Sequence, residues 1–253
     1  MNSVLVTGAS RGIGRYVATH FAEQGHDVAI TAIDEVELRK TAEELADLSE
    51  SGRTERFLAD SSEASEVRRV IEAVNDAFDG IDILVNNAGR VGPVGEFPTN
   101  DLRDWKRTVR TNLFGMVHYT YYILPSMKNQ GYGRIVNILG GGARSSRPTL
   151  SGYGTSKAAT LRFTTSVGEE LEGTNVRMNG VGPGVVATDL IDEIRYGERL
   201  SDEYAERLTE KVEEGETTDP EKLCRFIEFL AREELDETGE IWEVDEWEDP
   251  EEF

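Results

Sequence analysis

The sequence predicts an α/β protein built as a doubly wound parallel sheet in a single domain. Three observations support this fold class. Short apolar runs alternate with helix-forming segments from the first residues onward, a glycine-rich turn follows the first run, and no linker or break in composition divides the 253 residues. Repeated strand–helix–strand units need crossover connections, which make the strands parallel and place helices on both faces of the sheet. We therefore expect one domain over residues 1–253.

The expected elements alternate along the chain in the order that such a sheet requires. Strands are expected at the short apolar runs 4–6, 28–30, 57–59, 81–85, 134–139 and 176–181. Helices are expected where helix-forming residues recur at helical spacing, over 13–24, 35–48, 63–78, 109–127 and 153–171. Gly25 stands just past the first helix, where glycine commonly ends helices. The acidic segment 189–238 is expected to add helices, and 239–242 a late edge strand.

The composition excludes several classes of partner. Lys and Arg number 27 against 49 Asp and Glu, a formal charge of −22 at pH 7. A chain with this much negative charge repels phosphate backbones and anionic lipid surfaces. Neither nucleic acid nor a membrane is therefore expected as a partner. No segment approaches the ~18 apolar residues of a membrane span, and we expect a cytoplasmic protein. Cys224 is the single cysteine, which excludes an intramolecular disulfide and a cysteine-based zinc site; no metal is expected.

The acidic residues are concentrated in the last quarter of the chain. Residues 189–253 hold 26 acids and 7 bases, and 246–253 form an acidic tail. One interpretation is adaptation to a cytoplasm of high salt, where screening reduces the repulsion between carboxylates. The other is a solvated acidic face. The first is favoured because it also explains why the chain has 21 Arg but only 6 Lys.

A glycine-rich turn joins the first strand to the first helix. The run TGASRGIG covers residues 7–14 and contains Gly8, Gly12 and Gly14. Glycines here let the backbone turn tightly and approach a pyrophosphate, which then lies against the helix N-terminus. A purely structural turn is the alternative, but the position at the first strand–helix junction favours a nucleotide site.

Three further motifs accompany this turn in the order and spacing of one family. They are NNAG at 86–89, YGTSK at 153–157 and PGVVAT at 183–188. Together the four motifs resemble the short-chain dehydrogenase/reductase family over nearly the whole chain, from Ser3 to about Trp242. The resemblance implies a single-domain Rossmann fold and an NAD(P)-dependent oxidoreductase of the type EC 1.1.1.-. It implies hydride transfer between a nicotinamide and a small carbonyl or secondary alcohol.

The resemblance also implies the catalytic residues. Tyr153 would be the acid/base, and Lys157, at i+4 on the same helix face, would supply the cation that a phenol of ordinary pKa ~10 needs. Asn112 matches the residue that holds a water in the proton relay. The alternative for the Tyr/Lys pair is a packed aromatic beside a surface lysine. The implied cofactor-binding residues are Gly8, Ser10, Arg11, Gly12, Ile13, Gly14, Ile33, Asp60, Ser61, Asn87, Ala88, Gly89, Tyr153, Lys157, Pro183, Gly184, Val186 and Thr188.

One departure from the family pattern concerns the catalytic serine. Thirteen residues before Tyr153 the family usually has a Ser that hydrogen-bonds the reacting oxygen, and this chain has Gly140. Losing such a donor commonly costs ~10²–10³ in turnover. A backbone N–H of the glycine run, a water, or a hydroxyl of Ser145, Ser146 or Ser151 are the candidate replacements. We hypothesise a slow or unusual site that uses the glycine backbone.

The sequence favours NADP(H), with NAD(H) possible. The position of the acid that would bind the ribose 2′-hydroxyl falls at about Ala32, next to Ile33, and neither is charged. Arg11 would accommodate a 2′-phosphate. Asp34 is interpreted as a helix cap, with an indirect ribose contact as the alternative.

The substrate is not identified by the sequence. The pocket is expected from the loops at 91–98 and 141–152 and from the segment after Thr188. That segment resembles the family's substrate lid and includes Asp189, Leu190, Ile194, Tyr196 and Leu200. Arg90, Arg144 and Arg147 suggest an anionic substrate, or simply balance an acidic surface. Family members usually form homodimers or homotetramers, with which apolar Leu113, Val117, Leu161 and Phe163 are compatible. The alternatives are a catalytically impaired dinucleotide-binding sensor or scaffold, and a dehydratase or epimerase of the same fold.

Overall fold

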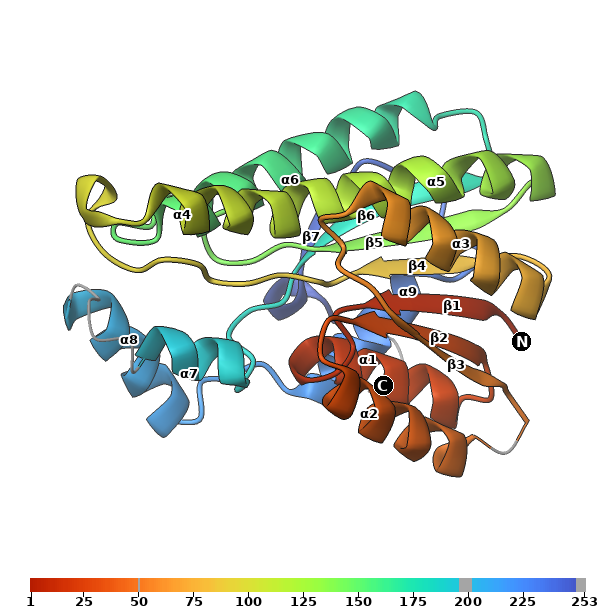
Figure 1. The fold of residues 1–253 in the computed structure, drawn as a ribbon, viewed down its shortest axis with the longest axis horizontal. Helices are drawn as coiled ribbons and strands as arrows, with labels where there is room; N and C mark the ends of the chain where they lie inside the picture. Colours follow the sequence, from red (N-terminus) through yellow and green to blue (C-terminus); the bar gives the residue numbers. More distant parts are fainter. Residues whose placement is uncertain (50, 196–201, 249–253) are drawn as a thin grey trace.

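A seven-stranded parallel sheet forms the centre of the molecule (Figure 1). The computed structural model describes residues 1–49, 51–195 and 202–248. The strand order is β3-β2-β1-β4-β5-β6-β7, and every neighbouring pair is parallel. The strands are β1 Ser3–Thr7, β2 Asp27–Ala32, β3 Thr54–Leu58, β4 Ile83–Asn86, β5 Gly133–Ile138, β6 Val176–Gly182 and β7 Ile241–Glu243. The predicted doubly wound α/β fold in a single domain is confirmed.

Helices cover both faces of the sheet, as crossover connections require. They are α1 Gly12–Glu23, α2 Glu35–Leu48, α3 Ala64–Phe78, α4 Leu102–Val109, α5 Gly115–Gln130, α6 Ser151–Glu170, α7 Asp189–Arg195, α8 Asp202–Glu213 and α9 Pro220–Leu230. In Figure 1, α4, α5 and α6 lie above the sheet, and α1 and α2 below it, whereas α7 and α8 project past its end.

Alternating side chains of each strand supply the two cores. Along β1, Val4 and Val6 enter the core shared with α1, α2 and α9, and Leu5 enters the core shared with α3 and α5. All three are fully buried, because helices cover both faces of the sheet and the side chains of β1 point to the two faces in turn. The predicted turn after α1 is also present, since Gly25 adopts the left-handed conformation, with φ +76°.

The predicted helix at 109–127 differs from the structure. The chain is helical from Leu102, and residues Arg110–Phe114 form a π-helical turn between α4 and α5. The helical periodicity of apolar residues does not show where one extra residue is inserted, whereas such turns are frequent at functional sites. Strand β3 also begins three residues earlier than the apolar run at 57–59 indicated, because it is an edge strand with exposed polar residues at its start.

The acidic C-terminal segment packs on the sheet through an aromatic cluster. Phe226 of α9 is fully buried and stacks on Trp247, with ring centroids 4.9 Å apart. Phe229 and Trp242 complete the cluster. The predicted added helices correspond to α7, α8 and α9, and the late strand to β7. Residues 249–253 of the predicted acidic tail lie outside the described residues. No helix in the described ranges is long and apolar enough to cross a bilayer.

Candidate active site

The glycine-rich turn is held against the carboxyl end of β4. Gly8 and Gly12 adopt left-handed conformations, with φ +65° and +57°. A Cβ on Gly8 would lie 2.7 Å from the Ala88 Cα, so only glycine allows this approach. Asn87 donates its side-chain N–H groups to the carbonyls of Thr7 and Gly8, at 3.0 and 3.1 Å. The NNAG segment therefore fixes the shape of the turn.

A cavity of about 720 Å³ opens beside this turn at the carboxyl ends of the strands. All predicted cofactor residues line it except Gly14, whose place is inside the turn against Asn87. Tyr153 and Lys157 line the same cavity, and Asn112 does not. Across the cleft, Thr188 after β6 faces Gly12, 3.5 Å from where a Cβ would stand. Sites outside the carboxyl ends of parallel strands are the usual ligand sites of this architecture.

Tyr153 and Lys157 occupy one face of α6. Both are buried, and the Lys157 Nζ lies 5.8 Å from the centroid of the Tyr153 ring. The ammonium donates to the carbonyl of Ile138 at 2.9 Å. Burial lowers the pKa of the Lys157 ammonium to about 8. Because the Lys157 side chain is buried, the alternative of a surface lysine beside a packed aromatic is wrong.

The glycine run 140–142 makes room for two side chains. A Cβ on Gly140 would lie closer than 3.0 Å to the hydroxyl of Tyr153, and a Cβ on Gly141 would lie 2.9 Å from Nη2 of Arg147. Gly142 has φ +128°, and a Cβ there would lie 3.0 Å from the Gly154 Cα. The tyrosine hydroxyl therefore stands where the side chain of the usual serine would begin.

Asn112 ties the loop after β4 to the helix that carries Tyr153. It lies in the π-helical turn, where its Oδ1 accepts from the Arg90 N–H at 2.8 Å. Its Nδ2 donates to the Arg90 carbonyl and to Ser156 Oγ, both at 2.9 Å. These bonds use the side chain's acceptor and both of its donors, and they join the loop to α6.

The part of the cavity beside β2 and β3 carries three of the predicted cofactor-binding residues, Ile33, Asp60 and Ser61. Ile33 is exposed on the cavity wall, and Ser61 is buried. Asp60 accepts from the Ser62 N–H at 2.9 Å. Asp34 accepts from the N–H groups of Val36 and Glu37, each at 3.0 Å, so it is the predicted cap of α2.

Arg11 links the glycine turn to α7. Its guanidinium pairs with Asp189 at 3.2 Å and with Glu193 at 3.1 Å. All three side chains are about half exposed or more. Of the predicted lid, Asp189, Leu190 and Ile194 line the cavity, whereas Tyr196 and Leu200 lie outside the described residues.

Besides Glu193, two charged residues of the cavity were missed by the sequence interpretation. Glu243, at the end of β7, packs against Gly182 and pairs with Arg144 at 3.4 Å. Burial raises the pKa of this carboxyl, and Arg144 opposes the effect. Arg107 of α4 also lines the cavity. Glu243 belongs to an acidic segment that is typical of a solvated face, and the only available signal was its place at the end of a strand.

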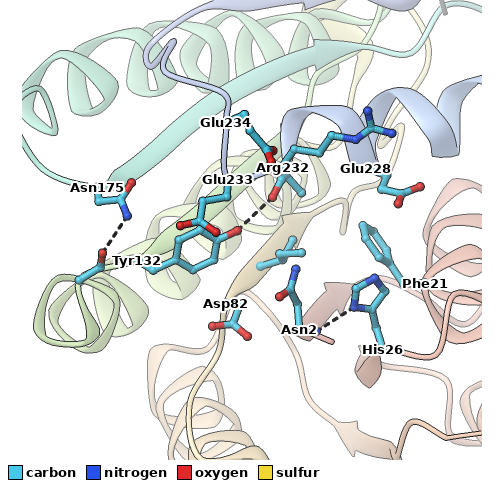
Figure 2. A pocket seen from close by; sticks show the side chains of 13 residues that line it. Asn2, Phe21, His26, Asp82, Tyr132, Asn175, Glu228, Arg232, Glu233 and Glu234 are labelled. Atoms are coloured by element: carbon cyan, nitrogen blue, oxygen red, sulfur yellow. Dashed lines mark hydrogen bonds between the residues drawn. The ribbon is translucent and has the colours of Figure 1, made fainter. Parts of the chain in front are cut away.

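A second cavity, of about 560 Å³, lies at the amino ends of the strands, beside the start of β4 (Figure 2). Figure 2 shows the Tyr132 hydroxyl donating to the carbonyl of Ala231, and the Asn2 N–H donating to His26. Glu228 at its wall pairs with His20 at 2.7 Å. The four motifs lie instead around the first cavity, at the carboxyl ends of the strands. Within residues 1–49, 51–195 and 202–248, no three His, Cys, Asp or Glu side chains gather as metal ligands.

The fold and the first cavity define a dinucleotide-binding protein of the doubly wound α/β class. Residues 2–199 match the short-chain dehydrogenase family, and the chain belongs to that family. It is 34% identical to a 3-oxoacyl-(acyl-carrier-protein) reductase of Aquifex aeolicus over 95% of this chain and 94% of that protein. It is 31% identical to a D-beta-hydroxybutyrate dehydrogenase of Cupriavidus necator over 96% of both chains. These relatives are oxidoreductases.

A solved structure agrees in both fold and sequence. A single-residue variant of actinorhodin polyketide ketoreductase, solved with NADPH, has a TM-score of 0.84 and 30% identity, over 96% of this chain and 95% of that one. The residues of the present cavity fit such a dinucleotide. The glycine turn offers a close backbone approach at the N-terminus of α1, and the cavity runs from there to Tyr153.

Proposed function

We propose that the chain is an NAD(P)-dependent oxidoreductase acting on a small carbonyl or secondary alcohol, with Tyr153 as the acid/base. The observation that carries the proposal is that Tyr153 and the buried Lys157 line the same cavity as the glycine turn. A nicotinamide bound there supplies or accepts hydride at the substrate carbon. The protein's own task is to hold the substrate and move one proton at its oxygen.

The proton step follows from the surroundings of Tyr153. Its hydroxyl reaches over Gly140 at the wall of the cavity, which supports the proposal that it gives or takes a proton at a substrate oxygen. The Lys157 ammonium stabilises the phenolate that results when Tyr153 gives up its proton, since an opposite charge nearby favours the charged form. Asn112 acts on this step through its bonds to Arg90 and Ser156, which position the loop and α6.

The proposed substitute for the usual serine is the backbone around Gly140. Because the Tyr153 hydroxyl already occupies the space of a serine side chain, the second donor to the substrate oxygen has to come from elsewhere. Residues 140–142 line the cavity, and backbone N–H donors there would cost no reorganisation during the reaction. This supports the hypothesis that the site works through its glycine run.

We propose that NADP(H) is preferred, with NAD(H) as a second cofactor. Ala32 and Ile33 put no carboxylate on the cavity wall after β2, where an acid would select the 2′-hydroxyl, and Asp34 is engaged as a cap. Arg11 is the cation available to a 2′-phosphate. Its pairs with Asp189 and Glu193 lower this preference, because a phosphate has to share or displace them.

A catalytically impaired dinucleotide-binding sensor or scaffold is the second candidate, and Gly140 is the observation in its favour. The deciding experiment is NADPH oxidation in molar KCl with a reactive α-dicarbonyl. We expect turnover by the intact protein, loss of turnover in Tyr153→Phe, and wild-type turnover in Tyr121→Phe. Tyr121 is the matched control because it is 70% exposed on α5 and outside the cavity.

NADPH binding, followed by tryptophan fluorescence, separates the two candidates. Binding without turnover in the intact protein would favour the sensor or scaffold. Equal turnover in both tyrosine variants would refute the role of Tyr153.

We also propose that the chain forms a homodimer or homotetramer. Leu113, Val117, Leu161 and Phe163 are only half buried within one chain, and Phe114 beside them is exposed. Light scattering at several protein concentrations tests this, and a monomer at micromolar concentration would contradict it.

A further inference from the structure

The cavity that holds Tyr153 is cationic in a strongly acidic protein. Six basic side chains line it, against four carboxylates, although the whole chain carries −22. Carboxylates already pair with several of the six: Arg11 with α7, Arg144 with Glu243, and Arg90 with Asp104 at 2.8 Å. A cavity lined by more basic than acidic side chains attracts an anionic ligand, even on a protein whose net charge is negative.

Besides Lys157, Arg147 is a basic residue that lies beside the glycine run over which the Tyr153 hydroxyl stands. Its side chain runs along the glycine run, with Nη2 against Gly141 and Cγ against Gly142, and its Cβ lies 3.7 Å from where a Cβ on Gly154 would stand. A side chain at Gly141 or Gly142 would therefore contact Arg147, as a side chain at Gly140 would contact Tyr153. Consecutive Cα atoms are about 3.8 Å apart, so the phenol and the guanidinium stand over neighbouring residues of one backbone.

Residues of its own loop hold the Arg147 guanidinium, and Arg147 lines the cavity. Its Nη1 donates to Ser145 Oγ at 2.8 Å and to the Ser146 carbonyl at 3.2 Å. Arg147 is half buried, which strengthens a charge-assisted hydrogen bond relative to one on the open surface. The planar guanidinium matches the two oxygens of a carboxylate.

We propose that Arg147 binds the anionic group of the substrate, and that the substrate class is a short oxo acid whose carboxylate lies within a few bonds of its carbonyl. The short separation is part of the proposal, because the two groups contact adjacent residues, Gly140 and Gly141, and one small molecule would have to reach both the Tyr153 hydroxyl and the guanidinium. The inference rests on the proposed oxidoreductase function and specifies its substrate.

The test compares acetoacetate with its neutral methyl ester as substrates for NADPH oxidation. The wild type is expected to show a kcat/KM at least about 10-fold higher for the acid. Arg147→Gln is expected to lower kcat/KM for acetoacetate by about 10- to 100-fold, the usual effect of a hydrogen bond to a charged group, and that for the ester by less than about 3-fold. Arg147→Lys is expected to fall between, because the charge stays but the planar fork is lost.

Arg103→Gln is the control for the change of charge, since the Arg103 side chain is 95% exposed and outside the cavity. Its kinetics are expected to equal those of the wild type. NADPH affinity, measured by tryptophan fluorescence, is expected to stay unchanged in all the variants.

A wild type that prefers the ester, or reduces neither compound, overturns the substrate class. An equal fall for both substrates in Arg147→Gln assigns Arg147 to loop structure and also overturns it. The proposed oxidoreductase function survives each of these results if the α-dicarbonyl is still reduced, and fails separately if it is not.

Discussion

A methyl group at position 140 is expected to displace the catalytic hydroxyl. The φ angle of Gly140 lies outside the left-handed region, so alanine is compatible with the backbone there. The added Cβ, however, would lie closer than 3.0 Å to the hydroxyl of Tyr153. Carbon and oxygen atoms need more than this for van der Waals contact, and the hydroxyl has to move by roughly 1 Å.

The tyrosine has little freedom to make this move without losing its function. Its side chain is 7% exposed and packs in one apolar cluster with Val91, Leu150, Ile194 and Leu208. A displacement of about 1 Å at a reacting group costs on the order of 10²-fold in rate. We therefore expect Gly140→Ala to lower kcat by about 100-fold, with NADPH affinity unchanged because the glycine turn is untouched.

The assay is single-turnover reduction of the α-dicarbonyl at saturating NADPH, with binding measured by tryptophan fluorescence. Gly154→Ala is the matched control: its Cβ meets the nearest atom, Arg147 Cβ, at an ordinary 3.7 Å, so turnover is expected to remain. Gly140→Ser adds a hydroxyl to the same Cβ, and its rate relative to Gly140→Ala measures what that donor contributes. A kcat for Gly140→Ala within about 3-fold of the wild type would refute the displacement reasoning.

Four further results are expected. Because burial lowers the pKa of Lys157 to about 8, its ammonium is present below that pH and lost above it, so kcat/KM for reduction should fall above pH 8; a rate that stays level to pH 9.5 contradicts this. Phe226→Ala should lower the free energy of unfolding by about 3–5 kcal/mol in urea melts followed by Trp247 fluorescence; a loss below about 1 kcal/mol would show that the aromatic cluster does not anchor the C-terminal segment. Asp189→Asn with Glu193→Gln should strengthen NADPH relative to NADH binding by about 2- to 5-fold at low salt, and an unchanged ratio removes α7 from cofactor choice. Far-UV circular dichroism should show structure in molar KCl that is lost in dilute buffer, and full stability in dilute buffer would favour the solvated acidic face.

The sequence was sufficient to predict the fold class because its signals are local and repeated. Every crossover carries its own apolar strand and amphipathic helix, and the glycine turn marks the first junction. The errors concern the start of β3 and the helix expected at 109–127, where apolar residues do not mark the boundaries of the elements. Strand β3 exposes Glu55 and Arg56, so only its end was visible, and the π-helical turn at Arg110–Phe114 keeps an apparently continuous helical pattern.

The predicted site residues came from motifs, which record short-range spacing. Tyr153 and Lys157 are one helical turn apart, so their common face was predictable from the sequence. What the sequence did not contain was which distant atoms fill the space above a glycine. The approach of Tyr153 to Gly140 and the position of Glu243 against Gly182 depend on how loops from different strands meet.

The packing of α9 against α1 joins two helices that lie far apart in the sequence. Val17 and Phe21 of α1 share a core with Phe226 and Ile227, and His20 pairs with Glu228 at 2.7 Å. Until α9 emerges from the ribosome, α1 keeps an uncovered apolar side. At the usual speed of translation this interval lasts roughly 10 to 40 seconds, during which the nascent chain has to be shielded from aggregation.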